Sequence, residues 1–287
     1  MSKFLINING ELFNEETAKI SVFDRGLLYG DSVYEVTRTF DRIPFRLDKH
    51  LERLFHSAQK IELTPTLSKA MIEQRIQETI QASQHDNLNL RIILTRGTNS
   101  DLGLDPELSS TNNLIIITKA ILPNPDWWLT QGLSLVFSKK KATQKGPLPK
   151  SGNYQENLLA HKEALSKGAF DAIMVNTENH VTECSTSNIW LVKNGRIYTP
   201  ALRDGVLEGL TRKTLFEMAK CKNIPLEEKS LVPEDFLLAD ECFITSTTRN
   251  IVPVTSIENQ SISTGLPGKV TLALLKQYLA YVTPSEP

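Results

Sequence analysis

The spacing of hydrophobic residues in the first half of the chain changes from a period of two to a helical period and back. Positions 33–40 alternate and are rich in β-formers, which predicts a strand. Leu47, Leu51 and Leu54 then recur at helical spacing, with Asp48 as the expected N-cap. The pattern predicts strands over 3–8, 33–40, 43–47, 90–95 and 114–121, a hairpin turn at Asn9-Gly10, and helices over 47–61 and 68–83.

A proline-containing stretch, Leu122-Pro123-Asn124-Pro125-Asp126, separates this half from the second. Two prolines so close together interrupt both helices and sheets, so we expect an interdomain linker over 123–132. It would join a small N-terminal α/β domain over 1–122 to a larger C-terminal domain over 133–287. The second half is predicted to contain strands over 133–138, 172–176, 188–192, 241–245 and 251–257, and helices over 154–166, 211–222 and 269–281. Hairpins rather than regular β-α-β alternation indicate an α+β fold.

Composition narrows the classes of function. The 32 Lys and Arg residues against 33 Asp and Glu residues leave a net charge of −1, which gives no reason to expect a nucleic-acid or acidic-membrane partner. No apolar stretch approaches the ~20 residues of a membrane helix, and the N-terminus lacks the apolar region of a signal peptide, so we expect a cytoplasmic protein. The three cysteines and five histidines have none of the spacings of a disulfide framework or a metal site.

Two residues have surroundings that suit covalent cofactor chemistry. Lys150 stands between a proline-rich connection and a predicted helix start, where partial desolvation would lower its pKa as a Schiff-base amine requires. Glu183 is expected at the end of a strand, where a carboxylate can pair with a pyridinium nitrogen. When each position is considered alone, Lys150 can also be an ordinary surface lysine and Glu183 an ordinary surface glutamate.

Two further segments suit a phosphate group. Gly209-Leu210-Thr211 leads into a helix, whose free backbone N–H groups and threonine hydroxyl would form an anion site. The hydroxyl cluster Thr245-Ser246-Thr247-Thr248 follows an apolar strand and would complete a phosphate cup, with Arg53 as a charged donor. A simple threonine N-cap, a polar loop and a solvent-facing arginine are the alternative interpretations.

The order and spacing of these segments resemble the class IV (fold-type IV) aminotransferases, which use pyridoxal 5′-phosphate (PLP). The matching segments are 24–35, 45–58, 150–164, 181–189, 209–212 and 245–254, with 24–35 resembling an N-terminal active-site strand. The resemblance implies a two-domain α+β fold of the D-amino-acid aminotransferase type with PLP in the interdomain cleft. It also implies a homodimer or higher homo-oligomer, in which a loop from the neighbouring subunit closes each site.

The resemblance implies a role for each matched residue. Lys150 would hold PLP as a Schiff base and then act as general base and acid, while Glu183 would keep the pyridine nitrogen protonated. Tyr154 would lie near the cofactor. The phosphate would be held by Arg53, by the backbone amides of Leu210 and Thr211, and by the hydroxyls of Thr247 and Thr248. Substrate contacts would come from Tyr29, Tyr34, Arg38 and Arg96.

The motifs that bear on the substrate resemble those of two related groups of transaminases. Tyr29, Gly30 and Arg38 resemble branched-chain L-amino-acid aminotransferases, although Val36 stands where their pattern has glycine. Residues 30–36 and 95–97 resemble D-amino-acid aminotransferases. Here, however, the loop after Gly97 lacks the Arg-x-His carboxylate trap of those enzymes, so a D-specific enzyme would need Arg25, Arg38 or Arg96 instead. The sequence favours amino transfer between a branched-chain L-amino acid and a 2-oxo acid.

Two other functions remain as alternatives. Aminodeoxychorismate lyases, which serve 4-aminobenzoate and folate synthesis, share Arg38, the spacing of Asn153 after Lys150 and the string 182–184, but some carry Thr at the position of Glu35. A catalytically silent PLP carrier on the same fold belongs to another class of function. The intact set of Lys150, Glu183 and Arg53 argues against such a carrier.

Overall fold

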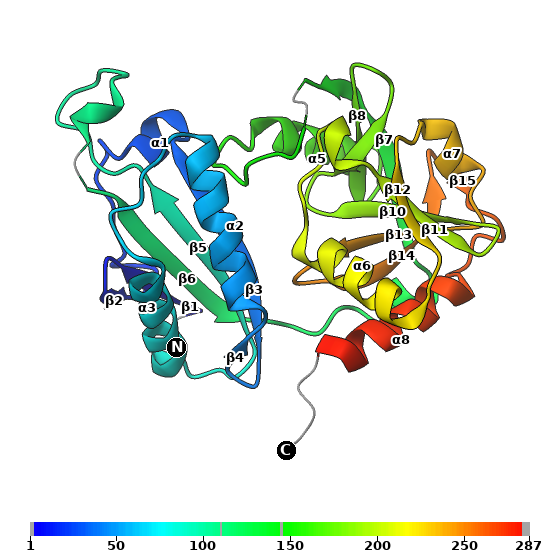
Figure 1. Ribbon diagram of the computed structural model, residues 1–287, viewed down its shortest axis with the longest axis horizontal. Coiled ribbons are helices and arrows are strands. Elements are labelled where there is room, and N and C mark those ends of the chain that lie inside the picture. Colours follow the sequence, from blue (N-terminus) through cyan, green and yellow to red (C-terminus); the bar gives the residue numbers. More distant parts are fainter. Residues whose placement is uncertain (1–2, 110, 144–145, 283–287) are drawn as a thin grey trace. The chain divides into compact units, whose positions relative to one another are not determined.

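The computed structural model describes residues 3–109, 111–143 and 146–282, and the chain divides into two compact units (Figure 1). The first unit extends to Leu122 and also includes Pro149–Asn153. The second consists of Pro123–Leu148 and the chain from Tyr154 onward. Within the described ranges, every helix is too short or too polar to cross a membrane.

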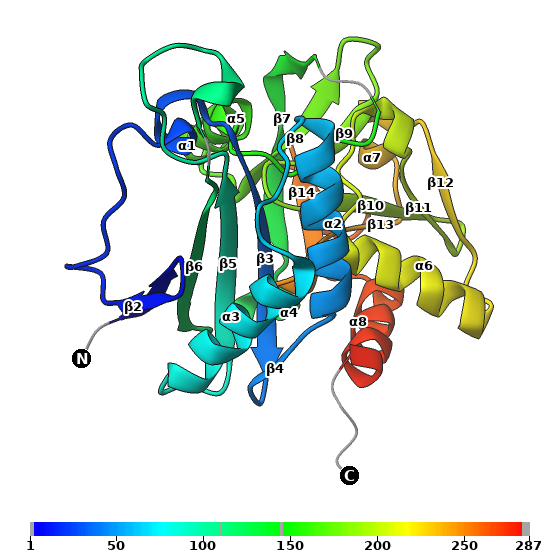
Figure 2. The same cartoon turned by 60° about the vertical axis from the view of Figure 1, so that its left-hand side comes forward.

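The first unit is built on a six-stranded sheet with the strand order β2-β1-β6-β5-β3-β4. Its elements are β1 Phe4–Ile8, β2 Glu11–Phe13, α1 Arg25–Tyr29, β3 Ser32–Phe40, β4 Ile43–Pro44, α2 Leu47–Lys60, α3 Lys69–Ala82, β5 Leu88–Thr95, η1 Pro106–Leu108 and β6 Asn113–Ala120. All neighbouring strands are antiparallel. Leu90 and Ile92 of β5 share a face with Ile116 of β6, and α2 and α3 cover this face to form a buried core. Figure 2 shows α2 running alongside β3.

Three local expectations for this unit are wrong. Asp48 lies in the first turn of α2 and does not cap it, because the helix begins at Leu47 after Arg46, which is left-handed with φ 47°. The strand expected over 43–47 is therefore limited to Ile43–Pro44. Residues 25–29, expected in an active-site strand, form the helix α1, because the Asp24 side chain accepts a hydrogen bond from Gly26 N and caps it.

The second unit contains a nine-stranded mixed sheet. Its elements are α4 Trp127–Thr130, β7 Leu133–Ala142, α5 Gln155–Ser166, β8 Asp171–Asn176, β9 Val181–Cys184, β10 Asn188–Lys193, β11 Arg196–Pro200, η2 Leu202–Asp204, α6 Leu210–Lys222, β12 Leu226–Lys229, α7 Pro233–Leu237, β13 Glu241–Ser246, β14 Asn250–Ile257, β15 Gln260–Ser261 and α8 Lys269–Val282. Eight strands follow the order β12-β11-β10-β13-β14-β7-β8-β9, and β15 pairs with β14. The pairs β7–β8, β7–β14 and β11–β12 are parallel, and the others are antiparallel. Helix α4 lies inside the stretch expected to be a linker.

A short segment of the later chain completes the first unit. Tyr34 N donates to Lys150 O at 2.9 Å, Gly152 N donates to Ser32 O at 2.8 Å, and a β-bridge joins Val33 to Ser151. The close pairing depends on glycine, because a Cβ at Gly152 would lie 2.3 Å from Ser32 Oγ. The backbone of Lys150 is therefore attached to the edge of β3.

Candidate active site

A buried charged group lies between β3 and α2 of the first unit. Glu35 pairs with Ile92 across the sheet and so faces the side that α2 covers. Arg53 donates from Nε to Oε1 and from Nη2 to Oε2 of Glu35, both at 2.7 Å. His50 Nδ1 lies 2.8 Å from the same Oε2, and both His50 and Glu35 are fully buried. The expected phosphate ligand Arg53 is thus oriented by a bidentate ion pair.

The electrostatics of this group favour one charge state. Burial alone would raise the pKa of Glu35, but the charge and hydrogen bonds of Arg53, with a further bond from His50, outweigh burial and lower the pKa to about 2. Burial lowers the pKa of His50, which favours its neutral form. The group therefore consists of a carboxylate, a guanidinium and a neutral imidazole at neutral pH.

We expect Glu35→Gln to lower the free energy of unfolding by about 3 kcal/mol, because it leaves Arg53 without its carboxylate partner. Since the folded-state pKa of Glu35 is depressed, its stabilisation is complete above pH 4.5 or so and is lost as the pH falls towards about 2. Urea unfolding of the wild type and of Glu35→Gln from pH 2 to 7 measures the difference in their free energies of unfolding. Glu52→Gln, on the exposed side of α2, is the control and should cost under about 0.5 kcal/mol. If the difference between the wild type and Glu35→Gln does not decrease towards pH 2, the charged pair of Glu35 and Arg53 is not the source of the stability.

Lys150 is held close to this group within the first unit. Its Nζ lies 4.4 Å from the centre of the Tyr34 ring, and its backbone N donates to Ser57 Oγ on α2 at 3.0 Å. The ammonium group also contributes to the lowered pKa of His50. The first unit therefore brings together Lys150, Tyr34 and Arg53 from three separate parts of the sequence, with Lys150 half-buried and its backbone held by hydrogen bonds.

In the second unit, Glu183 lies on β9 and its carboxylate is fixed from two directions. Asn188 Nδ2 and Leu207 N donate to Oε2 at 3.1 and 3.2 Å. Asn188 Nδ2 also donates to Leu207 O at 3.0 Å. An ionised carboxylate held in this way is suited to accept a hydrogen bond from a pyridinium nitrogen. The part played by Leu207 has no signature in the sequence, because it comes from the backbone.

The start of α6 presents polar groups that suit a phosphate. The helix begins at Leu210, and its N-cap Gly209 has no side chain to accept from the first N–H groups. Within the described structure, Thr211 Oγ1 and Ser246 Oγ are buried without hydrogen-bond partners. A Cβ at Gly209 would lie 2.0 Å from Asn188 Oδ1, so a side chain cannot fill this place. A phosphate would supply the missing acceptors, which fits the cofactor that the sequence indicates.

Tyr154, Thr247 and Thr248 lie in the same unit as Glu183. Tyr154 is the N-cap of α5, and its hydroxyl donates to Ser185 O at 2.6 Å. Thr247 and Thr248 form the turn between β13 and β14, directly after Ser246. These three residues are placed by the elements that the sequence predicted, and their contacts with a cofactor remain predictions.

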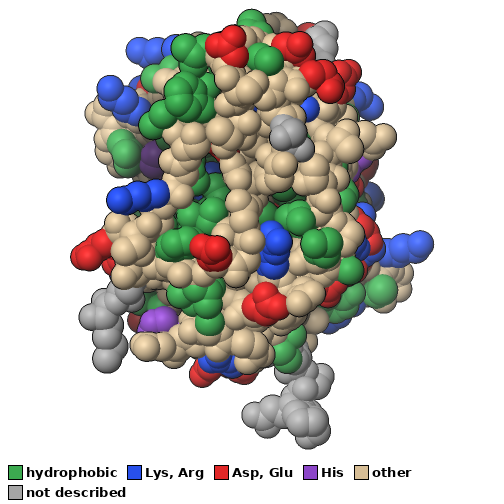
Figure 3. Space-filling view, turned by 90° about the vertical axis from the view of Figure 1, so that its left-hand side faces the viewer, with side chains coloured by type: hydrophobic (Ala, Val, Ile, Leu, Met, Phe, Trp, Pro, Cys, Tyr) green, Lys and Arg blue, Asp and Glu red, His purple; other side chains and the backbone are tan. Residues whose placement is uncertain are grey.

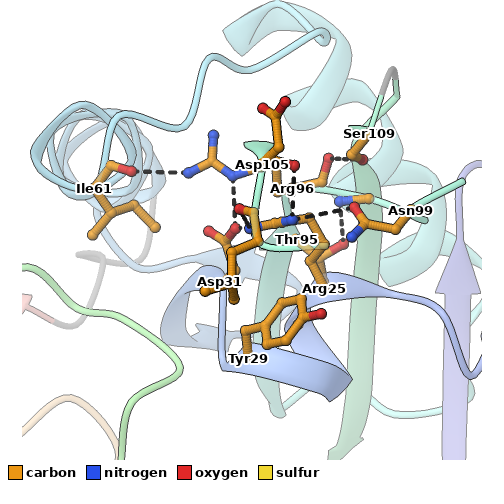
Figure 4. Close-up of polar contacts among 12 residues, drawn as sticks. Arg25, Tyr29, Asp31, Ile61, Thr95, Arg96, Asn99, Asp105 and Ser109 are labelled. Carbon is orange, nitrogen blue, oxygen red and sulfur yellow. Dashed lines mark hydrogen bonds and ion pairs between the residues drawn. The ribbon is translucent and has the colours of Figure 1, made fainter. Parts of the chain in front are cut away.

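Arg25 and Arg96, considered above as substrate cations, are bonded within the first unit (Figure 4). Their Nε atoms donate to Asp31 Oδ2 at 2.8 and 2.7 Å. Burial acts to raise the pKa of Asp31, but the hydrogen bonds and charges of the two arginines outweigh it and lower the pKa. The remaining donors of both side chains bond to Asn99 and to backbone carbonyls of Ile61, Glu62, Gly103, Leu104 and Asp105.

The other two candidate substrate residues have structural contacts as well. Tyr29 donates from its hydroxyl to Leu102 O at 2.6 Å, and Arg25 stacks on its ring. Arg25 and Tyr29 therefore hold the loop that follows β5. The Arg38 guanidinium carbon lies 4.3 Å from the centre of the Phe40 ring.

Comparison with known proteins covers almost the entire chain. A protein of Methanocaldococcus jannaschii, provisionally named as a branched-chain-amino-acid aminotransferase, is 33% identical over 276 residues, which are 95% of this chain and 94% of that protein. The D-alanine aminotransferase of Bacillus licheniformis is 31% identical over 92% of each chain. The crystal structure of the branched-chain amino acid aminotransferase from Escherichia coli has a TM-score of 0.88 and 28% identity, covering 98% of this chain and 95% of that one. Another branched-chain amino acid aminotransferase, crystallised with pyridoxamine 5′-phosphate, has a TM-score of 0.91 at 28% identity and covers 99% of this chain and 95% of its own. The family model for class IV aminotransferases matches residues 32–257, so the chain belongs to the class IV aminotransferases, PLP-dependent transaminases of fold type IV.

Proposed function

We propose that this transaminase moves the amino group of branched-chain L-amino acids to a 2-oxo acid. The main support for the proposal is that the side chains of Arg25 and Arg96 already bind groups of the protein itself. A D-specific site would need one of them, or Arg38, in place of the missing carboxylate trap. Arg25 and Arg96 are both bonded to Asp31 and to backbone carbonyls.

Similar solved structures support the same choice, whereas similar sequences include both kinds of enzyme. Proteins named as branched-chain aminotransferases are similar to this chain in sequence and in structure. Proteins named D-alanine aminotransferases are similar in sequence at 29–31% identity, which makes a D-amino-acid aminotransferase the second candidate.

We assign parts in cofactor binding to the residues described above, each within its own unit. Lys150 Nζ would bind PLP covalently, and the open start of α6, the Thr211 hydroxyl, Thr247 and Thr248 would bind its phosphate together with Arg53. PLP supplies an electron sink for the substrate Cα–H bond. Glu183 would hold a proton on the pyridine nitrogen, and Lys150 Nζ would remove the Cα proton and return it.

We also propose a homodimer or larger homo-oligomer located in the cytoplasm. Leu27, Leu102 and Leu104 are 60%, 62% and 76% exposed on α1 and on the loop that Arg25 holds. Figure 3 shows hydrophobic side chains on the surface of the molecule from the side of the first unit. A second copy of the chain would bury such leucines. A monomer mass in sedimentation velocity, or a membrane fraction on cell fractionation, would contradict these assignments.

The substrate is tested by a half-reaction without any 2-oxo acid. Purified PLP-loaded protein is mixed with L-leucine or with D-alanine, and the absorbance of the lysine-bound cofactor is followed. We expect L-leucine to bleach this absorbance and D-alanine to leave it unchanged. Bleaching by D-alanine alone would replace the proposal with a D-amino-acid enzyme. If neither amino acid bleaches it, aminodeoxychorismate is the next substrate to test, and no response to any amino donor would indicate a silent carrier.

A further inference from the structure

The three residues between β9 and β10 and the first residue of β10, Ser185-Thr186-Ser187-Asn188, form what we call the 185–188 corner. Ser185 Oγ donates to the buried carboxylate of Asp171, and Ser185 O accepts from the Tyr154 hydroxyl and from Asn157 Nδ2. At its other end, Asn188 donates to Glu183. The corner therefore helps to position both the Tyr154 hydroxyl and, together with Leu207 N, the Glu183 carboxylate.

Arg249 binds this corner from the turn between β13 and β14. Its Nη1 donates to Thr186 Oγ1 at 2.8 Å and to Ser187 Oγ at 3.1 Å. The guanidinium carbon lies 5.4 Å from the centre of the Phe170 ring. Asn124 Nδ2 donates to Arg249 O at 2.9 Å, so the backbone is held as well as the side chain.

The binding partners of the Arg249 side chain differ from those of three other arginines of the candidate site. Arg25, Arg53 and Arg96 each bind a carboxylate, whereas within the described residues Arg249 binds only neutral hydroxyls and an aromatic ring. Bonds from a guanidinium to hydroxyls are weaker than a bidentate ion pair with a carboxylate. Strong ion pairing therefore does not explain an arginine at this place, whereas its reach to two adjacent hydroxyls does.

The two segments that Arg249 joins carry groups for different parts of the same cofactor. Thr247 and Thr248 directly precede Arg249, and Ser187 directly precedes Asn188, the residue bonded to Glu183. We propose that Arg249 is a positioning residue, which keeps the Glu183 carboxylate at a fixed distance from the proposed phosphate-binding turn at Thr247 and Thr248. This inference rests on the cofactor roles assigned above, but it does not depend on which amino acid is the substrate.

The test is PLP binding to the full-length apoprotein. We expect Arg249→Met to weaken the dissociation constant for PLP about tenfold, because both hydrogen bonds to the corner are lost. We also expect the absorbance of the lysine-bound cofactor to change its pH dependence, because a displaced Glu183 controls the pyridine proton less well. Arg249→Lys retains a donor and should recover most of both properties.

Two further sets of variants separate this role from general structural support. Arg196→Met removes an exposed arginine of the second unit whose ion pair with Glu227 is loose at 4.0 Å, and it should leave PLP binding unchanged. The double substitution Thr186→Val with Ser187→Ala removes the acceptors, and its effect should not add to that of Arg249→Met.

The outcomes are distinct. Unchanged PLP affinity and an unchanged spectrum in Arg249→Met would overturn the proposal, as would lowered thermal stability as the only effect. A raised KM for L-leucine with normal PLP affinity would instead assign Arg249 to substrate binding. If the wild-type chain does not bind PLP at all, the cofactor assignments fail first, which is separable from a failure of Arg249 alone.

Discussion

Lys150→Ala should lower the rate of transamination by on the order of 10⁴-fold or more and remove the absorbance of the lysine-bound cofactor. Alanine would provide neither the amine proposed to bind PLP nor the base proposed to move the Cα proton. The fold should be preserved, because the bonds that attach this segment to β3 are made by the backbone of Lys150 and Gly152. The effect is therefore chemical rather than structural.

Absorbance spectra and single-turnover assays with L-leucine measure the effect of Lys150→Ala, and thermal unfolding verifies the fold. Lys162→Ala on the exposed side of α5 is the matched control and should behave as the wild type. If both the absorbance and turnover persist in Lys150→Ala, another amine carries the cofactor.

Glu183→Gln should retain PLP but slow removal of the Cα proton on the order of a thousandfold. Glutamine has the shape of glutamate, and its amide oxygen can still accept from Asn188 Nδ2 and Leu207 N, so the local packing is kept. The neutral amide cannot stabilise a protonated pyridine nitrogen, and the cofactor then withdraws electrons less strongly.

Single-turnover rates with deuterated and undeuterated L-leucine isolate the proton-transfer step in Glu183→Gln. Glu208→Gln, an exposed residue of the same unit, is the control and should show the wild-type rate. A near-normal rate in Glu183→Gln would remove this carboxylate from the mechanism.

The elements that were predicted well have long and regular hydrophobic patterns. Helices α3 and α8 begin and end within one or two residues of the expected positions, because one face of each is buried and the spacing of apolar residues records that face. Strand β3 also lies within one residue of its expected bounds, although three of its four fully buried residues, Glu35, Thr37 and Thr39, are polar. Short elements are different. Helices α1 and α7 have five residues each, too few to show a period, and β12 is mostly exposed, so its sequence carries no alternation.

The residues of the candidate site also fall into two groups, those that the sequence indicated and those that it did not. Motif spacing indicated Lys150, Arg53 and Glu183, and the structure places each on or beside the expected element. Glu35 and His50 were not assigned a role, although a glutamate inside a β-rich run and a histidine one helical turn before Arg53 were visible in the sequence. Which hydroxyls an arginine such as Arg249 reaches depends on how separate strands are brought together, and a single sequence does not record that.

The attachment of residues 150–152 to β3 also has a consequence for the order of events during synthesis. The strand that pairs along Ser32, Val33 and Tyr34 leaves the ribosome only after the linker and β7 have been made. Until then the nascent first unit exposes a sheet edge whose backbone groups can pair with other chains. Emergence of Gly152 covers the part of this edge at Ser32–Tyr34, so the segment that positions Lys150 also protects backbone groups that were open to misassembly.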